Sequence, residues 1–306
     1  MKLIKTLLTI LFISLLSSPS WSVSSDDLVE REGIYYEKFT DVPFTGKVTG
    51  KEKGTMKNGL YDGAWVFKLP DGSVDSESTG NYKNGGKEGI WVQYHENGQL
   101  WSKGNYKNGK EEGDWVYYFD NGQLSYKGNY EDGTLEGAWV DYHRNGQLSL
   151  KENYRNGKRE GTWVRYYENG NLFKKWNYKN GKRVGTSVSY HVNGEFNYKG
   201  NHKNGKKEGD WDSYHENGQL KSKVNFKDGK LEGARVWYYE NGQLDWKINY
   251  KNGQREGASV SYHENGQLDY KGTWKNDKRE GAWVLLKEDG TVNEERTGTF
   301  KDGKKI

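Results

Sequence analysis

Cysteine is absent from this chain of 306 residues, and proline occurs only three times. Without cysteine the fold cannot be held by disulfides, and a lipoprotein anchor, which needs a cysteine after the export signal, is excluded. With so little proline, nothing interrupts a continuous ladder of hydrogen bonds between β-strands. The stability of the fold must therefore come from another source, and the sequence points to repetition.

Hydrophobic residues are also scarce, at 32% of the chain. Globular domains usually have about 45–50%, although that range includes glycine. Disordered chains share the deficit but are poor in aromatic residues. This chain has 13 Trp, 23 Tyr and 9 Phe, which supply large amphipathic side chains for burial. A thin, extended architecture needs much less core than a globule, and we expect that shape.

The first 22 residues have the three parts of a secretory signal peptide. Lys2 and Lys5 form the positive segment, and Leu7–Leu16 forms the apolar segment. Ser20–Ser22 has a small residue at each end, so we expect cleavage after Ser22. An uncleaved anchor is the alternative, but the apolar stretch is short for a membrane span. We therefore expect export to the periplasm, the cell surface or the medium, between which the sequence does not distinguish.

The chain also lacks a large excess of charge of one sign. Removing Lys2 and Lys5 with the signal peptide lowers the net charge from +4 to +2. Proteins that bind nucleic acid neutralise many phosphates and carry a strong basic excess. The balanced charge therefore excludes that class of function.

A repeat of 24 residues organises the remaining chain. Each copy is marked by a glycine that usually follows an acidic residue, and only the first spacing differs, at 26 residues. We expect a signal peptide (1–22), a lead-in with a cap (23–60) and ten repeats with a C-terminal cap (61–306). The marker glycines are Gly63, Gly89, Gly113, Gly137, Gly161, Gly185, Gly209, Gly233, Gly257 and Gly281.

Two Asn-Gly steps divide each repeat, such as Asn97-Gly98 and Asn108-Gly109. Asn-Gly between alternating segments is a strong signal for a two-residue type I′ hairpin turn. The intervening segments are rich in residues that favour strands. The fold class is therefore all-β, an elongated single-layer antiparallel sheet of tandem β-hairpins. Ten units of two strands, about 4.8 Å apart, would extend roughly 100 Å.

A two-residue loop at Asn97-Gly98 would fix the register of the hairpin. It pairs Glu96 with Gln99 and His95 with Leu100. It also pairs Trp91 with Gly104, so that an indole can lie over a residue without a side chain. Some repeats depart from this pattern: Ser187, Arg235 and Ser259 replace the tryptophan, and Glu152, Trp176, Val224 and Ile248 replace the glycine.

The recurring pattern Tyr-x-Glu-Asn-Gly-Gln-Leu, then Lys-Gly-Asn-Tyr-Lys-Asn-Gly-Lys-x-Glu-Gly-x-Trp, resembles the bacterial variant of the MORN repeat (membrane occupation and recognition nexus). The resemblance is best in 93–115 and 117–139 and extends over roughly 55–303. It implies a β-hairpin scaffold for protein contacts, with disputed claims of phospholipid binding. Members of the variant family are often labelled YwqK-type antitoxins, which implies little about mechanism.

Repeated polar residues do not form an active site. His95, His143, His191, His215 and His263 share one position before a turn. Neighbouring units lie about 10 Å apart, whereas zinc ligands lie about 2 Å from a common ion. We therefore expect exposed strand-end residues, with no metal or cofactor. Each turn also has a lone acid rather than a unique set, and phosphate-binding loops are missing, so we expect no enzyme.

Two features could support binding, and each also has a purely structural interpretation. The aromatic ladder could stack on sugar rings or contact an apolar surface, or it could simply hold a one-layer sheet together. The basic edge could meet an anionic surface, or it could be a solvated rim. The ladder consists of Trp65, Trp91, Trp115, Trp139, Trp163, Trp211 and Trp283. The basic edge consists of Lys107, Lys110, Lys158, Arg159, Lys182, Arg183, Lys206 and Lys207.

The function expected from these features is that of an exported, non-enzymatic scaffold for protein–protein interaction. Many equal, weak contacts along the array would supply affinity, and the partner could be a second copy of the chain. The alternative is an envelope module that binds glycan or anionic lipid. An antitoxin or immunity-type inhibitor is implied by the family label alone. The sequence does not determine the partner or the oligomeric state.

Overall fold

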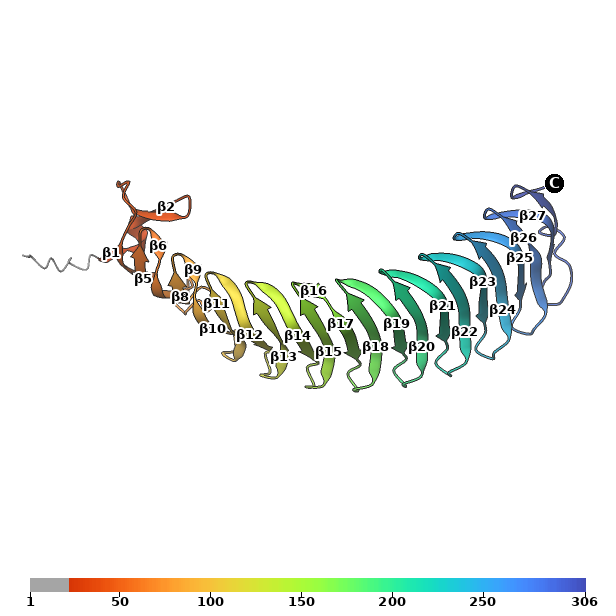
Figure 1. Cartoon of the computed structure of the whole chain (residues 1–306), viewed down its shortest axis with the longest axis horizontal. Coiled ribbons are helices and arrows are strands. Elements are labelled where there is room, and N and C mark those ends of the chain that lie inside the picture. The colour runs from red at the N-terminus through yellow and green to blue at the C-terminus, as the bar shows by residue number, and fades with distance from the viewer. Residues whose placement is uncertain (1–21) are drawn as a thin grey trace, which may run out of the picture. The chain divides into compact units, whose positions relative to one another are not determined.

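A computed structural model describes residues 22–306, and nearly all their regular structure is β (Figure 1). The predicted signal peptide, apart from Ser22, lies outside the described residues. Contacts divide the chain into two compact units. Unit 1 contains the chain up to Trp91 together with Tyr106–Lys110, and unit 2 contains Val92–Asn105 and Glu111–Ile306. The first repeat therefore shares a unit with the lead-in.

Unit 1 contains a sheet in the order β1-β4-β5-β7-β8-β9, with β6 paired to β5, and a separate β2–β3 hairpin. Its core consists of Phe44, Val48, Met56 and Trp65. The elements are β1 Ser22–Ser24, the 3₁₀ turn η1 Ser25–Asp27, β2 Leu28–Arg31, β3 Ile34–Glu37, β4 Gly46–Thr49, β5 Glu52–Lys57, β6 Leu60–Tyr61, β7 Gly63–Phe67, β8 Gly80–Lys83 and β9 Gly86–Lys87.

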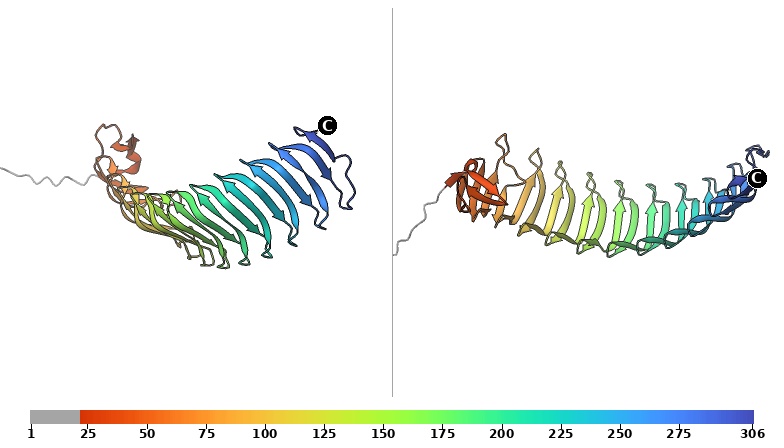
Figure 2. Two further views of the ribbon diagram at one scale, coloured as in Figure 1. Left: turned by 45° about the vertical axis from the view of Figure 1, so that its right-hand side comes forward. Right: turned by 90° about the horizontal axis from the view of Figure 1, so that it is seen from above.

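Strands β10 to β29 form one sheet of 20 strands, in which neighbours in sequence are neighbours in space. Figures 1 and 2 show these strands of unit 2 following one another in sequence order, joined by turns at both edges. The predicted antiparallel sheet of tandem hairpins is thus confirmed. The strands are β10 Gly89–Tyr94, β11 Leu100–Lys107, β12 Lys110–Tyr118, β13 Leu124–Glu131, β14 Thr134–Tyr142, β15 Leu148–Arg155, β16 Lys158–Arg159, β17 Gly161–Tyr166, β18 Leu172–Lys179, β19 Lys182–Tyr190, β20 Phe196–Lys203, β21 Lys206–Tyr214, β22 Leu220–Lys227, β23 Lys230–Tyr238, β24 Leu244–Lys251, β25 Gln254–Tyr262, β26 Leu268–Lys275, β27 Lys278–Leu285, β28 Gly298–Lys301 and β29 Lys304–Lys305.

The two Asn-Gly turns of a repeat have different conformations. Asn108 and Gly109 both have positive φ, at 51° and 79°, as the predicted type I′ turn requires. At the other turn only Gly98 has positive φ, at 79°. There the Gly98 N–H donates to the His95 carbonyl, and the His95 N–H donates to the Gln99 carbonyl, both at 2.8 Å. This is a three-residue loop with a glycine bulge, so the predicted type I′ turn and Glu96–Gln99 pairing are wrong.

A bulge corrects the register before the tryptophan is reached. In the β12–β13 hairpin, Tyr118 lies opposite Leu124, whereas Tyr117 lies opposite Tyr126. One extra residue is thereby absorbed, and Trp115 lies opposite Gly128. The predicted alignment of tryptophan with glycine across the hairpin is therefore confirmed at the equivalent positions, although His95 does not pair with Leu100 as predicted.

A second bulge bends the long strands at the glycine that marks each repeat. Between β13 and β14, Lys127 pairs with Val140 and Asn129 pairs with Glu136. Three residues, 137–139, therefore lie opposite Gly128, and Gly137 has a φ of 71°. A strand bends at such a bulge, and the bend makes room for an indole on one side of a one-layer sheet.

The indole lies over a different glycine from the one predicted. A Cβ on Gly128 would lie 2.1 Å from the ring of Trp139, and one on Gly104 would lie 2.0 Å from the ring of Trp115. Each ring thus covers the glycine of the preceding strand, not the one in its own hairpin. The same relation holds for Gly54 and Trp65, Gly80 and Trp91, Gly200 and Trp211, and Gly272 and Trp283.

Candidate interaction surfaces

The tryptophan face is the side of the sheet that carries Trp115, Tyr117, Tyr126, Tyr130 and the residues at the same positions in other repeats. Tyr117 and Tyr126 stack there with ring centroids 4.1 Å apart. Trp115 packs against Tyr130 at 6.3 Å, and its indole N–H donates to the carbonyl of Asn105 at 3.2 Å. The aromatic rings of successive strands therefore form a continuous layer.

The tryptophans of the ladder are the core of this layer. Six of the seven are buried, with exposed fractions of 1–8%: Trp65, Trp91, Trp115, Trp163, Trp211 and Trp283. Trp139 is half-buried. Such burial agrees with the interpretation of the ladder as packing, because a covered ring offers little surface to a partner. Partner binding by these rings stays a prediction.

Large and small residues alternate across the contact between the indole and the preceding strand. Where Trp176 replaces the glycine, the residue that would carry the indole is Ser187, opposite it across a bulge. Val224 is matched in the same way by Arg235, and Ile248 pairs directly with Ser259. Glu152 is the exception: it replaces the glycine, but the next strand still carries a tryptophan, Trp163. Its buried carboxylate accepts a hydrogen bond from Arg159 at 2.8 Å.

The predicted basic edge consists of two sets of side chains that behave differently. Lys107, Lys110, Lys158, Lys182 and Lys206 are exposed at the type I′ turns. Arg159, Arg183 and Lys207 turn onto the tryptophan face, where Arg183 is half-buried and Arg159 and Lys207 remain exposed. Arg183 lies 3.7 Å from the ring of Trp176, and Lys207 lies 4.2 Å from the ring of Trp211.

The inward set continues in repeats that the sequence reasoning missed. Lys87 lies 4.1 Å from the ring of Trp91, Arg255 lies 3.8 Å from that of Trp274, and Arg279 lies 4.6 Å from that of Trp283. All these cations stand two residues before a marker glycine, so the 24-residue period could have found them. Cations over aromatic faces are favourable by about 0.5–2 kcal/mol.

Several cations crowd one another on the tryptophan face. Burial, followed by the charge of Arg235, lowers the pKa of Lys207. Burial and then Arg296 lower the pKa of Arg279. In both cases burial is the main cause, and a neighbouring positive charge lowers the pKa further.

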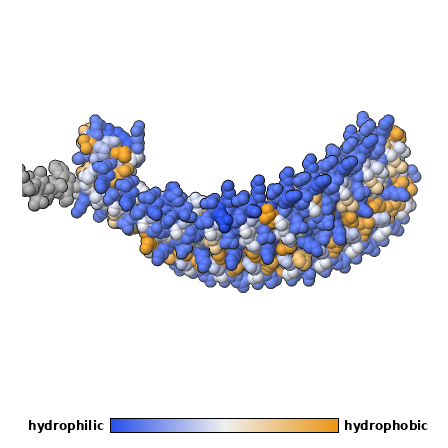
Figure 3. Space-filling view, in the orientation of Figure 1, coloured by the Kyte–Doolittle hydropathy of each residue, from blue (hydrophilic) through white to orange (hydrophobic). Residues whose placement is uncertain are grey.

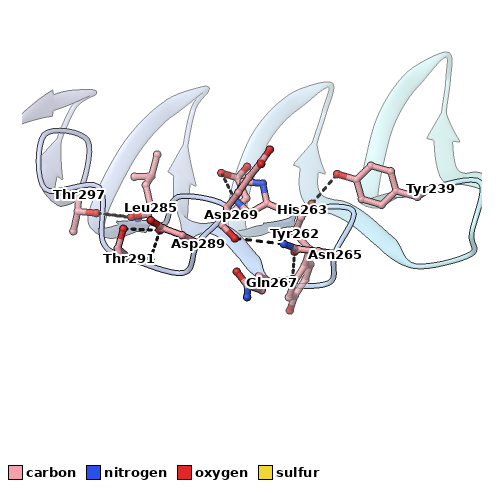
Figure 4. A network of polar contacts seen from close by, with 11 residues as sticks. Tyr239, Tyr262, His263, Asn265, Gln267, Asp269, Leu285, Asp289, Thr291 and Thr297 are labelled. Atoms are coloured by element: carbon pink, nitrogen blue, oxygen red, sulfur yellow. Dashed lines mark hydrogen bonds and ion pairs between the residues drawn. The ribbon is translucent and has the colours of Figure 1, made fainter.

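Four of the five recurring histidines contact a backbone carbonyl of the next repeat, and none of the five is exposed, contrary to the prediction. All five are half-buried. A ring nitrogen of His95 lies 2.9 Å from the carbonyl of Tyr118, and His215 lies 2.8 Å from that of Tyr238. In another repeat the hydroxyl of Tyr239 donates to the carbonyl of Tyr262 at 2.8 Å (Figure 4). Within residues 22–306, no group of three or more metal-ligating side chains is close enough to hold an ion.

The turn residues of the motif also connect repeats. At one edge, Asn97 donates to the carbonyl of Asp120 at 2.8 Å. At the other, the carboxylate of Glu112 accepts the backbone N–H of Asp132 at 3.0 Å. Before eight of the ten marker glycines, the acidic residue accepts a turn N–H of the next repeat in this way. The motif residues are therefore structural, and each bond reaches only the adjacent repeat.

Seven segments of 22 residues, about half of the chain, match the family model described as MORN repeat variant. The chain belongs to the MORN repeat variant family. The matched segments are 87–108, 111–132, 135–156, 159–180, 207–228, 231–252 and 255–276. MORN repeats are generally non-enzymatic scaffolds, which agrees with the structural role of the motif residues here. The repeat that contains Ser187 and His202 is outside the matched segments.

The other comparisons add no argument about function. No curated protein matches the chain. The crystal structure of TcdB2-TccC3-Cdc42 is similar at 13% identity and a TM-score of 0.18, over 85% of this chain and 17% of the other. A porin-like protein from Bacteroides uniformis is similar at 8% identity and a TM-score of 0.17, over 67% of this chain and 91% of the other. This MORN-repeat chain thus spans less than a fifth of the first structure, and neither TM-score supports an inference.

Across the described residues there is no helix with the length and apolar character needed to cross a membrane.

Proposed function

We propose that this protein is an exported, non-enzymatic MORN-repeat scaffold that binds a protein partner along its tryptophan face. The observation that carries the proposal is the row of cations over aromatic rings, which recurs on one face of the 20-stranded sheet from Arg159 to Arg279. Arginine and aromatic side chains are enriched at protein interfaces. Export rests on the sequence of residues 1–22 alone.

The repeated geometry favours many similar contacts over one strong pocket. In the space-filling view, hydrophilic side chains line the upper edge of unit 2, and hydrophobic patches lie on the face below it (Figure 3). A partner that engages several repeats gains affinity from each, and the second contact is intramolecular once the first has formed. A second copy of the chain is one possible partner of this kind.

A pull-down with the mature chain, residues 23–306, from its own cell-envelope extract tests the proposal. We expect one enriched protein that resists moderate salt. The double variant Arg183→Gln/Arg279→Gln should weaken capture several-fold, because it removes cations from the tryptophan face. Lys182→Gln/Lys278→Gln removes the same charge from the neighbouring residues at the exposed edge and should leave capture unchanged. Equal effects of the two variants, or a chain that fractionates with the cytoplasm, would contradict the proposal.

A second candidate is binding to an anionic lipid or glycan, which the exposed lysines at the type I′ turns favour. Each basic residue near an anionic membrane is worth about 1 kcal/mol. Binding to vesicles with phosphatidylserine should then fall steeply between low and high salt. Here Lys182→Gln/Lys278→Gln should be the damaging variant. The two candidates therefore predict opposite outcomes for the same pair of variants.

A further inference from the structure

The tryptophan ladder is interrupted in the repeat that follows Trp211. Arg235 stands where an indole would lie, and Val224 stands where the glycine would be beneath it. Its guanidinium lies 5.5 and 5.2 Å from the rings of Trp237 and Trp246, and Arg235 also lines the vacant position. The space that an indole fills in other repeats is left as a hollow of about 520 Å³.

The walls of this hollow are aromatic and apolar. Trp211 and Phe226 lie on the strands around it, with ring centroids 6.3 Å apart, and Val224 lies between them in the lining. Tyr198 extends the aromatic lining, 5.7 Å from Trp211. A flat ring would therefore find the same kind of contacts that the missing indole makes elsewhere in the array.

Three cations line the same hollow: Arg183, Lys207 and Arg235. None of them forms an ion pair with a carboxylate in the described part of the chain. Asp212 is the one acidic lining residue, but it follows Trp211 directly, pairs with Lys223 and so projects to the opposite face of the sheet. The positive charge at the hollow is thus uncompensated.

His202 adds a buried polar group beside these cations. It stands where other repeats have tyrosine, phenylalanine or tryptophan. Its exposed fraction is 8%, and its ring packs edge-on to Trp211 at 5.0 Å. One ring nitrogen bonds the hydroxyl of Ser187 at 2.8 Å. Burial and then the charges of Arg183 and Lys207 lower the pKa of His202, in agreement with a positive surrounding. Arg183, Ser187 and His202 all come from the repeat outside the family matches.

We propose that this hollow binds a small aromatic acid. Its ring occupies the vacant indole position against Trp211 and Phe226, and its carboxylate faces Arg183, Lys207 and Arg235. The volume lies in the range of about 300–1,000 Å³ that small-molecule sites have. This site does not depend on the proposed scaffold function, because all its lining residues lie between Arg183 and Arg235.

Titration calorimetry with 2-naphthoate and its neutral analogue 2-naphthamide tests the charge and the ring together. We expect saturable one-to-one binding of 2-naphthoate to residues 23–306, weakened by salt. The amide should bind roughly tenfold more weakly, because it forms no charge-assisted bonds with the cations. Absence of 2-naphthoate binding, or equal binding of both compounds, overturns the proposal.

Matched variants locate the site. Lys207→Gln and Arg235→Gln should each weaken 2-naphthoate roughly tenfold, whereas Lys206→Gln, with the same charge change at the exposed edge, should not. The double variant Val224→Gly/Arg235→Trp rebuilds the glycine–indole pair that Gly200 and Trp211 form in this chain, so it should fold and fill the hollow. Retention of binding by that folded variant places the ligand elsewhere and sinks the proposal.

Discussion

At the scale of single residues, side-chain volume is the strictest constraint on this fold. In six places an indole contacts the backbone of the preceding strand so closely that a side chain larger than that of glycine would overlap the ring. Gly128 is such a position, because its Cβ would lie 2.1 Å from Trp139. Glycine is required at this position because the indole ring lies so close to the backbone. At Gly109 it is favoured for a different reason, the positive φ of 79° in a type I′ turn.

Gly128→Ala should therefore destabilise the protein by about 1–3 kcal/mol through overpacking. The neighbouring Lys127→Ala, on the opposite face, should change stability by less than about 0.5 kcal/mol. Urea unfolding followed by tryptophan fluorescence measures both. Equal midpoints for the two variants would show that the ring moves aside without cost.

Protonation of His202 should affect stability in a defined pH range. Its pKa in the folded state is lowered from the ordinary value of 6.5, so the unfolded state binds the proton more readily. The stability linked to this group is therefore fully present above pH 6.5 and falls as the pH drops toward the lowered value. His202→Tyr, which restores the residue type of Tyr178, should remove this part of the pH dependence between pH 7 and 5. Thermal unfolding of both proteins across that range is the measurement, and identical slopes would refute the assignment.

At the scale of the strand pair, the unit of packing is the contact between one strand and the next repeat. The large–small exchanges at Trp176 and Ser187, and at Ile248 and Ser259, follow this contact, whereas Val224 and Arg235 leave a hollow. Within a hairpin, large residues are not matched with small ones, because Trp163 and Trp176 lie opposite each other and stack at 4.4 Å. The pairing of volumes therefore crosses the repeat boundary, and this is why neighbouring repeats bind one another.

A double-mutant cycle at Ile248 and Ser259 tests this pairing. Ser259→Trp alone should cost about 1–3 kcal/mol, because the new ring meets Ile248 and Trp274 loses its bond to the Ser259 hydroxyl. Adding Ile248→Gly should recover most of that loss, since it creates the room that Gly272 gives Trp283. The coupling energy comes from chemical unfolding of the four proteins. Simple additivity would contradict the pairing.

At the scale of the whole molecule, the array is held by contacts between nearest neighbours. The bonds between repeats join residues 20 to 24 positions apart, such as Asn156 to Glu136 and Asn145 to Glu168. In such arrays stability is close to a sum of repeat and interface contributions. No single repeat is then indispensable for the fold.

Deletion of residues 137–160, one full repeat, joins Glu136 to Gly161 and preserves the motif. This variant should fold with an unchanged far-ultraviolet spectrum and a melting temperature lower by only a few degrees. Deletion of residues 137–148 removes half a repeat, reverses strand direction and should not give a folded protein. Circular dichroism distinguishes these outcomes, and equal loss of structure in both variants would contradict the nearest-neighbour description.

The sequence by itself determined the repeat length, the all-β class and the positions of the turns in the repeats, because Asn-Gly spacing and strand periodicity are local properties. It also determined the type I′ turn at Asn108-Gly109. Only the tertiary structure decided the conformation of the other turn, because the same Asn-Gly sequence fits both a two-residue loop and a three-residue loop with a glycine bulge. It also decided which glycine lies under which indole, that four of the histidines connect repeats, and that Arg183 and Lys207 turn onto the tryptophan face. These features depend on contacts between strands that are distant in the repeat, and the hollow beside Trp211 exists only because such contacts leave one indole position unfilled.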